Sequence, residues 1–247
     1  MTASPAPHNR PEDIHRIVET VDRYNPQNIP ILEAYVEQQL TSADYAATTP
    51  STSSTTATTT STTYDRDACL AVLKLYQFNP AFSSNKVVCS ILQLALGALP
   101  DADFGLCLYM LNEDVLKDAG VAALVALHDL LQQARFKAFW AAVEDTPEDV
   151  LVNRALFADR IRIYIAGTLA IAYRVISIPT LQSALNLKDA AALDAFLKEH
   201  AWTRDPEDKD AVVLPATKEN QARPVVVQEN IKFEHLTKII GYGRMAQ

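Results

Sequence analysis

The sequence predicts a mainly α fold, in which short amphipathic helices stacked as in an α-solenoid are followed by a C-terminal winged helix with a small β-sheet. The 247 residues include only six glycines, whereas sheet-rich folds need frequent glycine-containing turns. Apolar residues recur at helical spacing between Asn-Pro, Leu-Pro and Thr-Pro breaks through residue 176. Two short β-branched runs then follow two helix-like stretches, which is the element order of a winged helix.

The N-terminal region contains the first two expected helices. Three prolines and no hydrophobic period predict a disordered tail over 1–12, before a helical repeat domain over 13–176. Apolar residues over 14–21 lie on one helix face. The segment RYNPQNIP at 23–30 ends this helix, because proline cannot donate the next backbone hydrogen bond. A second amphipathic helix is expected over 31–40.

A run of hydroxyl residues then interrupts the helical pattern. Residues 48–63 hold fourteen Ser or Thr in sixteen positions. Such a segment cannot bury enough apolar area to offset the entropy of ordering. We therefore expect a disordered loop between two helices, with a phosphorylation platform as the alternative.

Further helix-like stretches follow the hydroxyl run: 65–80, 83–100, 101–111, 120–145 (one or two helices), 147–158 and 161–176. Asp101 opens one of them as a favoured N-cap, and Thr146 with Pro147 resembles an N-cap followed by proline at the first helical position. Only eleven residues separate Arg162 from Arg174, whereas a membrane span needs about 20. This apolar run is therefore interpreted as a buried helix of a soluble protein without a signal peptide.

The C-terminal part predicts a winged helix over 177–228 and a terminal helix with a tail over 229–247. The elements assigned to the winged helix and its entry are a strand leading into a helix at 176–187, a helix at 189–202, and strands at 211–215 and 224–228. The strands flank a polar linker, as in a wing.

The charge balance disfavours nucleic-acid binding. The net charge is −8, and residues 180–247 hold nine Lys or Arg against ten Asp or Glu. The helix at 189–202 carries Asp189, Asp194 and Glu199 against Lys198, where a DNA-reading helix would carry basic and amide side chains. Use of the module in oligomerisation is the favoured interpretation, and a winged-helix nucleic-acid-binding regulator is the alternative.

No residue pattern predicts catalysis. Cys69, Cys89 and Cys107 lie in apolar helical stretches without paired metal-ligand spacing, so they are expected to be buried thiols. The five histidines form no catalytic motif, and no phosphate-binding or dinucleotide-binding glycine loop occurs. The acidic segment DPEDKD at 205–210 is interpreted as a solvated turn between helix and strand, since it lacks the glycine and terminal Glu of a calcium loop. We expect no catalytic, metal or cofactor site.

The segment LKLYQFNPAF at 73–82 concentrates large apolar side chains around a single charge. Aromatic residues at helical spacing usually belong to a core, so we interpret this segment as a joint between stacked helices. The alternative is that Tyr76, Phe78 or Phe82 contacts a partner subunit. The residues assigned to structural joints are Tyr76, Phe78, Pro80, Phe82 and Trp202.

Several segments resemble one known family. They are DRYNPQNIPILEAYVE at 22–37, LAVLKLYQFNPAF at 70–82, FKAFWAAVED at 136–145, and, at the C-terminal end, Trp202 and IKFEHLTKII at 231–240. Together they resemble the subunit K family of eukaryotic translation initiation factor 3. The hydroxyl run is a departure, because the family connects those helices with a shorter linker.

This resemblance implies a HEAT-like helical repeat domain, a C-terminal winged helix and a non-catalytic role. Implied partners are other subunits of the factor, especially subunit L, and the small ribosomal subunit through the complex. The implied location is cytoplasmic, without membrane contact, cofactors or direct sequence-specific nucleic-acid binding. The terminal helix would bind a partner through Ile231, Phe233, Leu236, Ile239 and Ile240. A scaffold subunit of a signalosome or proteasome-lid complex is the alternative within the same superfamily.

Overall fold

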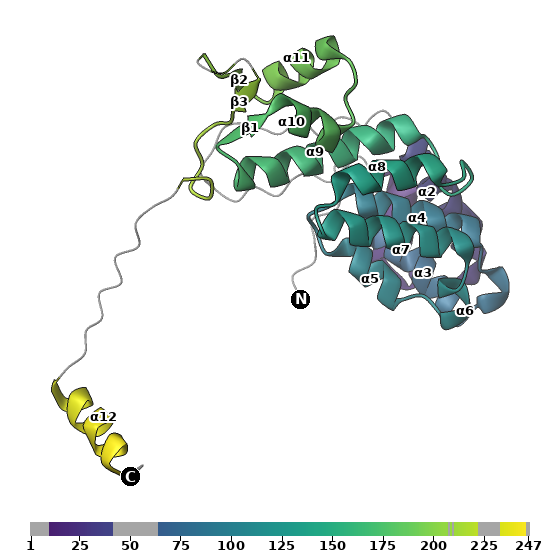
Figure 1. Cartoon of the computed structure of the whole chain (residues 1–247). Helices are drawn as coiled ribbons and strands as arrows, with labels where there is room; N and C mark the ends of the chain where they lie inside the picture. Colours follow the sequence, from purple (N-terminus) through teal and green to yellow (C-terminus); the bar gives the residue numbers. More distant parts are fainter. Residues whose placement is uncertain (1–9, 42–63, 207, 209, 222–232, 246–247) are drawn as a thin grey trace.

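The structure is a computed structural model, and it describes residues 10–41, 64–206, 208, 210–221 and 233–245. The described fold is mainly helical, with one small three-stranded antiparallel sheet. Helices α2 to α8 form a helical body, α9 leads from it to a smaller module that carries the sheet, and α12 lies apart from both (Figure 1). The hydroxyl run at 48–63 and residues 1–9 lie outside the described residues.

The chain joins the folded body at Arg10, earlier than the tail expected over 1–12. Pro11 directly precedes α1 (Glu12–Glu19), and the Arg10 side chain is 2% exposed and paired with Asp65. The prediction of a tail is therefore wrong for residues 10–12. A counter-charge more than fifty positions away holds this segment, and local sequence does not reveal it.

Two helical units are built on the same local plan. In both units an aromatic residue, Tyr24 or Phe78, is followed by Asn and Pro, and a 3-10 turn then leads toward the next helix. Phe78 is the last residue of an α-helix, whereas Tyr24 ends a 3-10 turn that follows the end of α1 at Glu19. The first unit comprises α1, η1 (Val21–Tyr24), η2 (Pro26–Asn28) and α2 (Ile29–Thr41), and the second comprises α3 (Arg66–Phe78), η4 (Pro80–Phe82) and α4 (Asn85–Gly97). The breaks expected at both Asn-Pro steps are confirmed.

Helix α4 lies at the centre of the helical body. Its residues from Val87 to Leu96 are all buried, and it contacts α2, α5, α7 and α9. Gly120 at the start of α7 allows one of these approaches, because an added Cβ would lie 3.0 Å from both Cys89 Sγ and Val150 Cγ2. This central helix organises the surrounding ones into a single core.

The next helices are α5 (Asp103–Tyr109), α6 (Glu113–Leu116), α7 (Ala119–Gln132) and α8 (Phe136–Asp145). Helix α5 begins two residues after the expected cap, with Ala102 at the N-cap position, so the assignment of Asp101 is wrong. The stretch 120–145 forms two helices, because Ala134 adopts a left-handed conformation with φ of 54°. The N–H of Arg135 then bonds the carbonyl of Leu130, which closes the end of α7.

One continuous helix, α9 (Arg154–Ala172), replaces the two helices expected over 147–158 and 161–176. Thr146 ends α8 and does not cap a new helix, because its hydroxyl donates to the carbonyl of Ala142 at 2.7 Å. Nothing between the two expected helices breaks the pattern, and Asp159 pairs with Arg162 one turn later at 2.7 Å.

The smaller module contains β1 (Val175–Ser177), α10 (Ile178–Leu185), α11 (Ala190–Glu199), β2 (Thr203–Arg204) and β3 (Ala211–Val213). The strand order is β1-β3-β2, and both pairings are antiparallel. The strand entering α10, the helix α11 and the strand at 211–215 are confirmed. Strand β2 was not expected, and the segment 205–210 therefore connects two strands. The strand expected at 224–228 lies outside the described residues.

The last described element is α12 (Phe233–Met245). Figure 1 shows it away from the helical body and from the smaller module. None of the described helices combines the length and apolarity that a bilayer crossing requires.

Candidate interaction surfaces

The thiols are buried within helices. All three cysteines are free, and burial raises the pKa of Cys89 to about 11 and that of Cys107 to about 12. Burial also raises the pKa of Cys69. These thiols stay protonated near neutral pH and are poor nucleophiles. Across the described ranges, no three His, Cys, Asp or Glu side chains cluster in a way that could hold a metal ion.

A buried ion pair joins the N-terminal segment to the start of α3. The Arg10 Nη2 donates to Asp65 Oδ1 at 2.6 Å, and Arg10 Nε donates to the other carboxylate oxygen. The same carboxylate accepts the N–H of Ala68 at 3.1 Å and so caps α3. Gln39 of α2 accepts the N–H of Asp65 at 2.6 Å. The N-terminal segment, α2 and the start of α3 are therefore joined at Asp65, through its carboxylate and its backbone N–H.

A second buried carboxylate continues this network. The Tyr64 hydroxyl donates to Asp103 Oδ2, and Arg66 Nη1 lies 3.3 Å from Asp103 Oδ1. Burial, followed by the hydrogen bond to Asp103, raises the pKa of Tyr64. The carboxylates of Asp65 and Asp103 are thus paired with Arg10 and Arg66, and the network connects the N-terminal segment with α2, α3 and α5.

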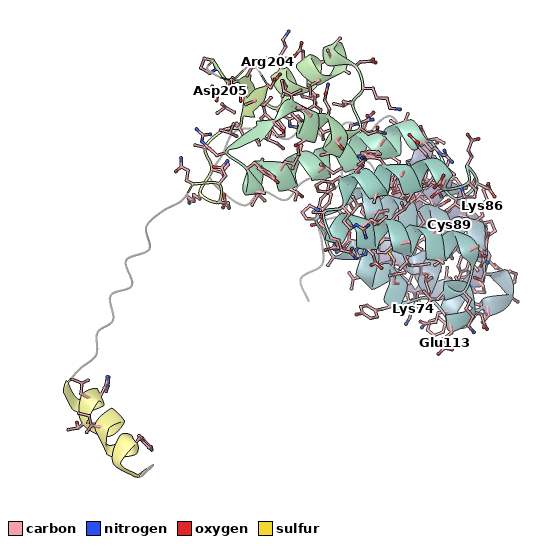
Figure 2. All side chains as sticks on the ribbon, viewed as in Figure 1. Lys74, Lys86, Cys89, Glu113, Arg204 and Asp205 are labelled. Atoms are coloured by element: carbon pink, nitrogen blue, oxygen red, sulfur yellow. The ribbon has the colours of Figure 1, made fainter. Side chains whose placement is uncertain are left out.

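Four exposed apolar side chains lie in or beside the two aromatic-Asn-Pro turns, and we call Val21, Tyr24, Phe78 and Phe82 the aromatic ridge. All four are more than half exposed, and the Tyr24 and Phe78 ring centroids lie 6.4 Å apart. Lys74 lies over the Phe78 ring at 5.1 Å. In Figure 2, Lys74 lies at one end of the helical body. The smaller module, in which Arg204 and Asp205 are labelled, lies at the opposite end. Exposed aromatics beside cations are typical of protein interfaces.

The joint at 73–82 is thus only partly a core. Tyr76 is buried, and its hydroxyl donates to Glu33. Phe78 and Phe82 are each 60% exposed, so the expectation that they pack in the core is wrong. Phe78 is the last residue of α3 and Phe82 the last of the 3-10 turn η4, and both lie outside the face that α3 buries. Their exposure favours the alternative of contact with a partner.

Helix α12 carries the residues expected to bind a partner. Leu236 and Ile240 lie one turn apart, and both are exposed, as is Tyr242. The side chains of Phe233 and Ile239, and the whole of Ile231, lie outside the described part. The described portion of α12 thus presents an apolar stripe to solvent.

Trp140 and Arg162 join the helical body to the smaller module, and sequence reasoning did not identify them as a joint. Trp140 Nε1 donates to the carbonyl of Ala184 at 2.7 Å, and Arg162 Nε donates to that of Leu185 at 3.0 Å. Arg162 also lies over the Trp140 ring at 5.4 Å. Both acceptors are carbonyls at the end of α10. The only sequence signal was that Trp140 lies in the segment 136–145 that supported the family resemblance.

Comparison with known proteins supports that resemblance. The profile of the CSN8/PSMD8/EIF3K family matches residues 83–226. The chain is 33% identical to eukaryotic translation initiation factor 3 subunit K of Yarrowia lipolytica, over 97% of each chain. It is 32% identical to that of Sclerotinia sclerotiorum, over 94% of this chain and 93% of the relative. The human subunit K is 30% identical, over 92% of this chain and 94% of the relative.

These similarities span both the helical body and the smaller module, and they confirm the resemblance inferred from the sequence. The profile alone covers more than half of the chain, from the start of α4 past β3. The chain therefore belongs to the CSN8/PSMD8/EIF3K family, and within it to the branch of eukaryotic translation initiation factor 3 subunit K.

Proposed function

We propose that this chain is a non-catalytic scaffold subunit of translation initiation factor 3, and that it contributes to initiation on the small ribosomal subunit through protein–protein contacts. The observation that carries this proposal is identity of about 30% or more, along more than nine-tenths of the chain, to relatives named as subunit K. The structure adds compatible chemistry, because buried charges neutralise one another while apolar side chains of the ridge and α12 remain exposed.

The proposed domain organisation follows the family. We propose a HEAT-like repeat domain over 13–176, a winged helix over 177–228 and a partner-binding helix within 229–247. The two helical units with the same aromatic-Asn-Pro plan support a repeat. Two helices followed by two antiparallel strands that an acidic turn connects support the winged helix.

Helix α12 is proposed to dock onto sibling subunits, chiefly subunit L. Leu236 and Ile240 would enter a groove of the partner as an apolar stripe at helical spacing. Ile231, Phe233 and Ile239 are proposed to extend the same surface. Binding through one helix face requires no reacting group and agrees with a cytoplasmic scaffold.

The proposal for α12 is tested by ending the chain after Pro224. We expect the shortened chain to fold, since the described contacts of the helical body and the smaller module lie before this point. Co-expression with subunit L should recover the full-length chain with its partner and the shortened chain without it. Unchanged recovery of subunit L would refute docking through α12. The double substitution Leu236→Ser with Ile240→Ser keeps the helix and provides a sharper variant.

The aromatic ridge is proposed as a second contact with a sibling subunit. Replacing both Phe78 and Phe82 by Ala should change the free energy of unfolding by less than about 1 kcal/mol, because both rings are mostly exposed. The variant should nevertheless lose part of its retention in the purified factor at raised salt. Retention equal to that of the unmodified chain would show that no partner covers the ridge.

Two alternatives retain some support. The matching family profile also covers signalosome and proteasome-lid subunits by its description, so a scaffold role in such a complex is the second candidate. A nucleic-acid-binding winged helix has less support, because α11 carries Asp194 and Glu199 beside Lys198 in a chain of net charge −8.

A further inference from the structure

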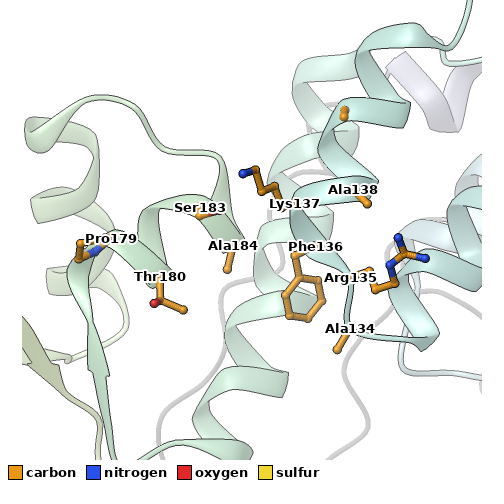
Figure 3. Close-up of a pocket in the computed structure, with 10 residues that line it drawn as sticks. Ala134, Arg135, Phe136, Lys137, Ala138, Pro179, Thr180, Ser183 and Ala184 are labelled. Carbon is orange, nitrogen blue, oxygen red and sulfur yellow. The ribbon is translucent and has the colours of Figure 1, made fainter.

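An open groove of about 790 Å³ lies between the start of α8 and helix α10, at the boundary between the helical body and the smaller module (Figure 3). Small apolar residues make up half of its lining: Ala134, Ala138, Ala141, Pro179 and Ala184. The ring of Phe136 contributes to the surface between the two helices. A lining of small side chains allows the backbone of another chain to approach closely.

The charged groups of the groove all have one sign. Arg135 and Lys137 line the α8 side, and none of the described residues that line the groove carries a carboxylate. Neither cation forms an ion pair or a side-chain hydrogen bond with the described part of the chain. In Figure 3, Lys137 extends from α8 toward α10, where Ser183 lies. A cationic groove is unexpected in a chain of net charge −8 and calls for an anionic occupant.

The groove is already formed in the free chain. The hydrogen bond from Trp140 to Ala184 and the one from Arg162 to Leu185 hold α10 against α8 and α9. A preorganised groove loses less conformational entropy when an occupant binds, which favours affinity. The helical body and the module therefore present it as one surface.

We propose that this groove binds an extended acidic segment of a partner protein. Its carboxylates would pair with Arg135 and Lys137, and its small apolar side chains would lie on the alanines and Pro179. A peptide fits better than a nucleic acid, because six of the ten lining residues are apolar and would contact the apolar side chains of a peptide. This proposal rests on the proposed scaffold function in one respect only, namely that the chain has a partner protein.

The occupant is expected to come from another protein. Few acidic side chains lie outside the described ranges: residues 1–9 and 246–247 contain none, 42–63 contain only Asp44, 222–232 contain only Glu229, and Glu207 is a single residue. Helix α12 holds one acid, Glu234, against Lys238 and Arg244. No such segment could neutralise two cations in the groove.

Fluorescence anisotropy with the full-length chain tests the proposal. The probes are a labelled peptide of alternating Glu and Ala, its counterpart of Lys and Ala, and an oligouridine of the same length. We expect the acidic peptide to bind, its affinity to fall as salt rises, and the other two probes to bind at least about tenfold more weakly. Tighter binding of the oligouridine, or equal binding of the two peptides, would overturn the proposal.

Charge reversal locates the binding. Arg135→Glu with Lys137→Glu should weaken binding of the acidic peptide at least about tenfold. The matched control, Lys117→Glu with Lys198→Glu, changes the net charge equally outside the groove and should retain most of the affinity. Equal losses in both variants would refute a site in the groove. Ser183→Trp fills the groove without changing the net charge and should also weaken binding of the acidic peptide. It replaces the charge-reversed variant as the test if that variant does not fold.

The groove variants are also assayed for recovery of subunit L. If the groove and α12 act separately, the charge-reversed chain binds the acidic peptide poorly but still recovers subunit L. Peptide binding that is unaffected by charge reversal removes the groove proposal and leaves docking through α12 standing. If truncation after Pro224 abolishes recovery of subunit L and charge reversal in the groove does not, the two proposals are tested independently of each other.

Discussion

Replacing Asp65 by Ala is expected to lower the free energy of unfolding by about 3–5 kcal/mol, because it removes the only buried carboxylate that pairs with Arg10 in the described part of the chain. The partners that remain for the guanidinium are the exposed Glu19 at 3.1 Å and the partly exposed Asp67 at 3.7 Å. The Arg10 and Asp65 side chains are 2% and 1% exposed. Burial alone lowers the pKa of Arg10, but the hydrogen bond and charge of Asp65 outweigh it and raise the pKa above its ordinary value. The substitution also removes the cap of α3 at Ala68. Chemical denaturation of the full-length chain measures the loss.

Two control variants distinguish the cost of leaving a buried charge poorly paired from the cost of losing an ion pair at the surface. Asp114→Ala removes the surface pair with Lys117 and should cost no more than about 1 kcal/mol, because both partners are mostly exposed. Replacing Arg10 by Met together with Asp65→Ala should recover part of the loss, since no buried charge then remains unpaired. A cost below about 1 kcal/mol for Asp65→Ala alone would show that the N-terminal segment is not held by this ion pair.

Replacing Trp202 by Ala is expected to cost about 3–5 kcal/mol by leaving a cavity in the smaller module. The ring is 6% exposed and meets Phe196 edge-on, with centroids 5.9 Å apart. Its backbone N–H donates to the carbonyl of Leu197 at 2.8 Å, which ties it to the end of α11. The role of Trp202 as a structural joint thus stays a prediction that this substitution tests.

Denaturation followed by circular dichroism measures the effect of Trp202→Ala. Phe82→Ala is the exposed aromatic control and should change stability by less than about 1 kcal/mol. If the smaller module unfolds separately in the variant, α10 should lose protection from hydrogen exchange while α4 keeps it. Equal stability of the two variants would mean that the Trp202 ring contributes little packing energy.

Helical periodicity predicted most elements because their signals are local. The stretches that became α3 and α4 carry apolar residues on every turn, Pro80 closely follows the end of α3, and Pro26 separates two 3-10 turns that follow α1. The split of α9 was predicted wrongly because Pro147 suggested a helix start, whereas the hydroxyl of Thr146 caps the end of α8. Strand β2 has two residues, too few for a periodic signal.

The surfaces were harder to predict than the helices because they depend on contacts distant in sequence. Tyr24 and Phe78 are separated by more than fifty residues, and only the fold shows that both lie on one exposed ridge. The groove likewise needs α8 and α10 side by side, which the bond from Trp140 to Ala184 secures. The apolar surface of the terminal helix, in contrast, was predicted from the local spacing of Ile231, Phe233, Leu236, Ile239 and Ile240, and the described side chains of Leu236 and Ile240 are exposed.

The central claim is that the chain works as a scaffold subunit of translation initiation factor 3. Affinity purification of the tagged full-length chain from native extract, with mass spectrometry and sedimentation against small ribosomal subunits, tests it most directly. The account predicts recovery of the other subunits of the factor, subunit L foremost, and co-sedimentation with the small ribosomal subunit. Recovery of cullin or proteasome components without initiation-factor subunits would contradict it.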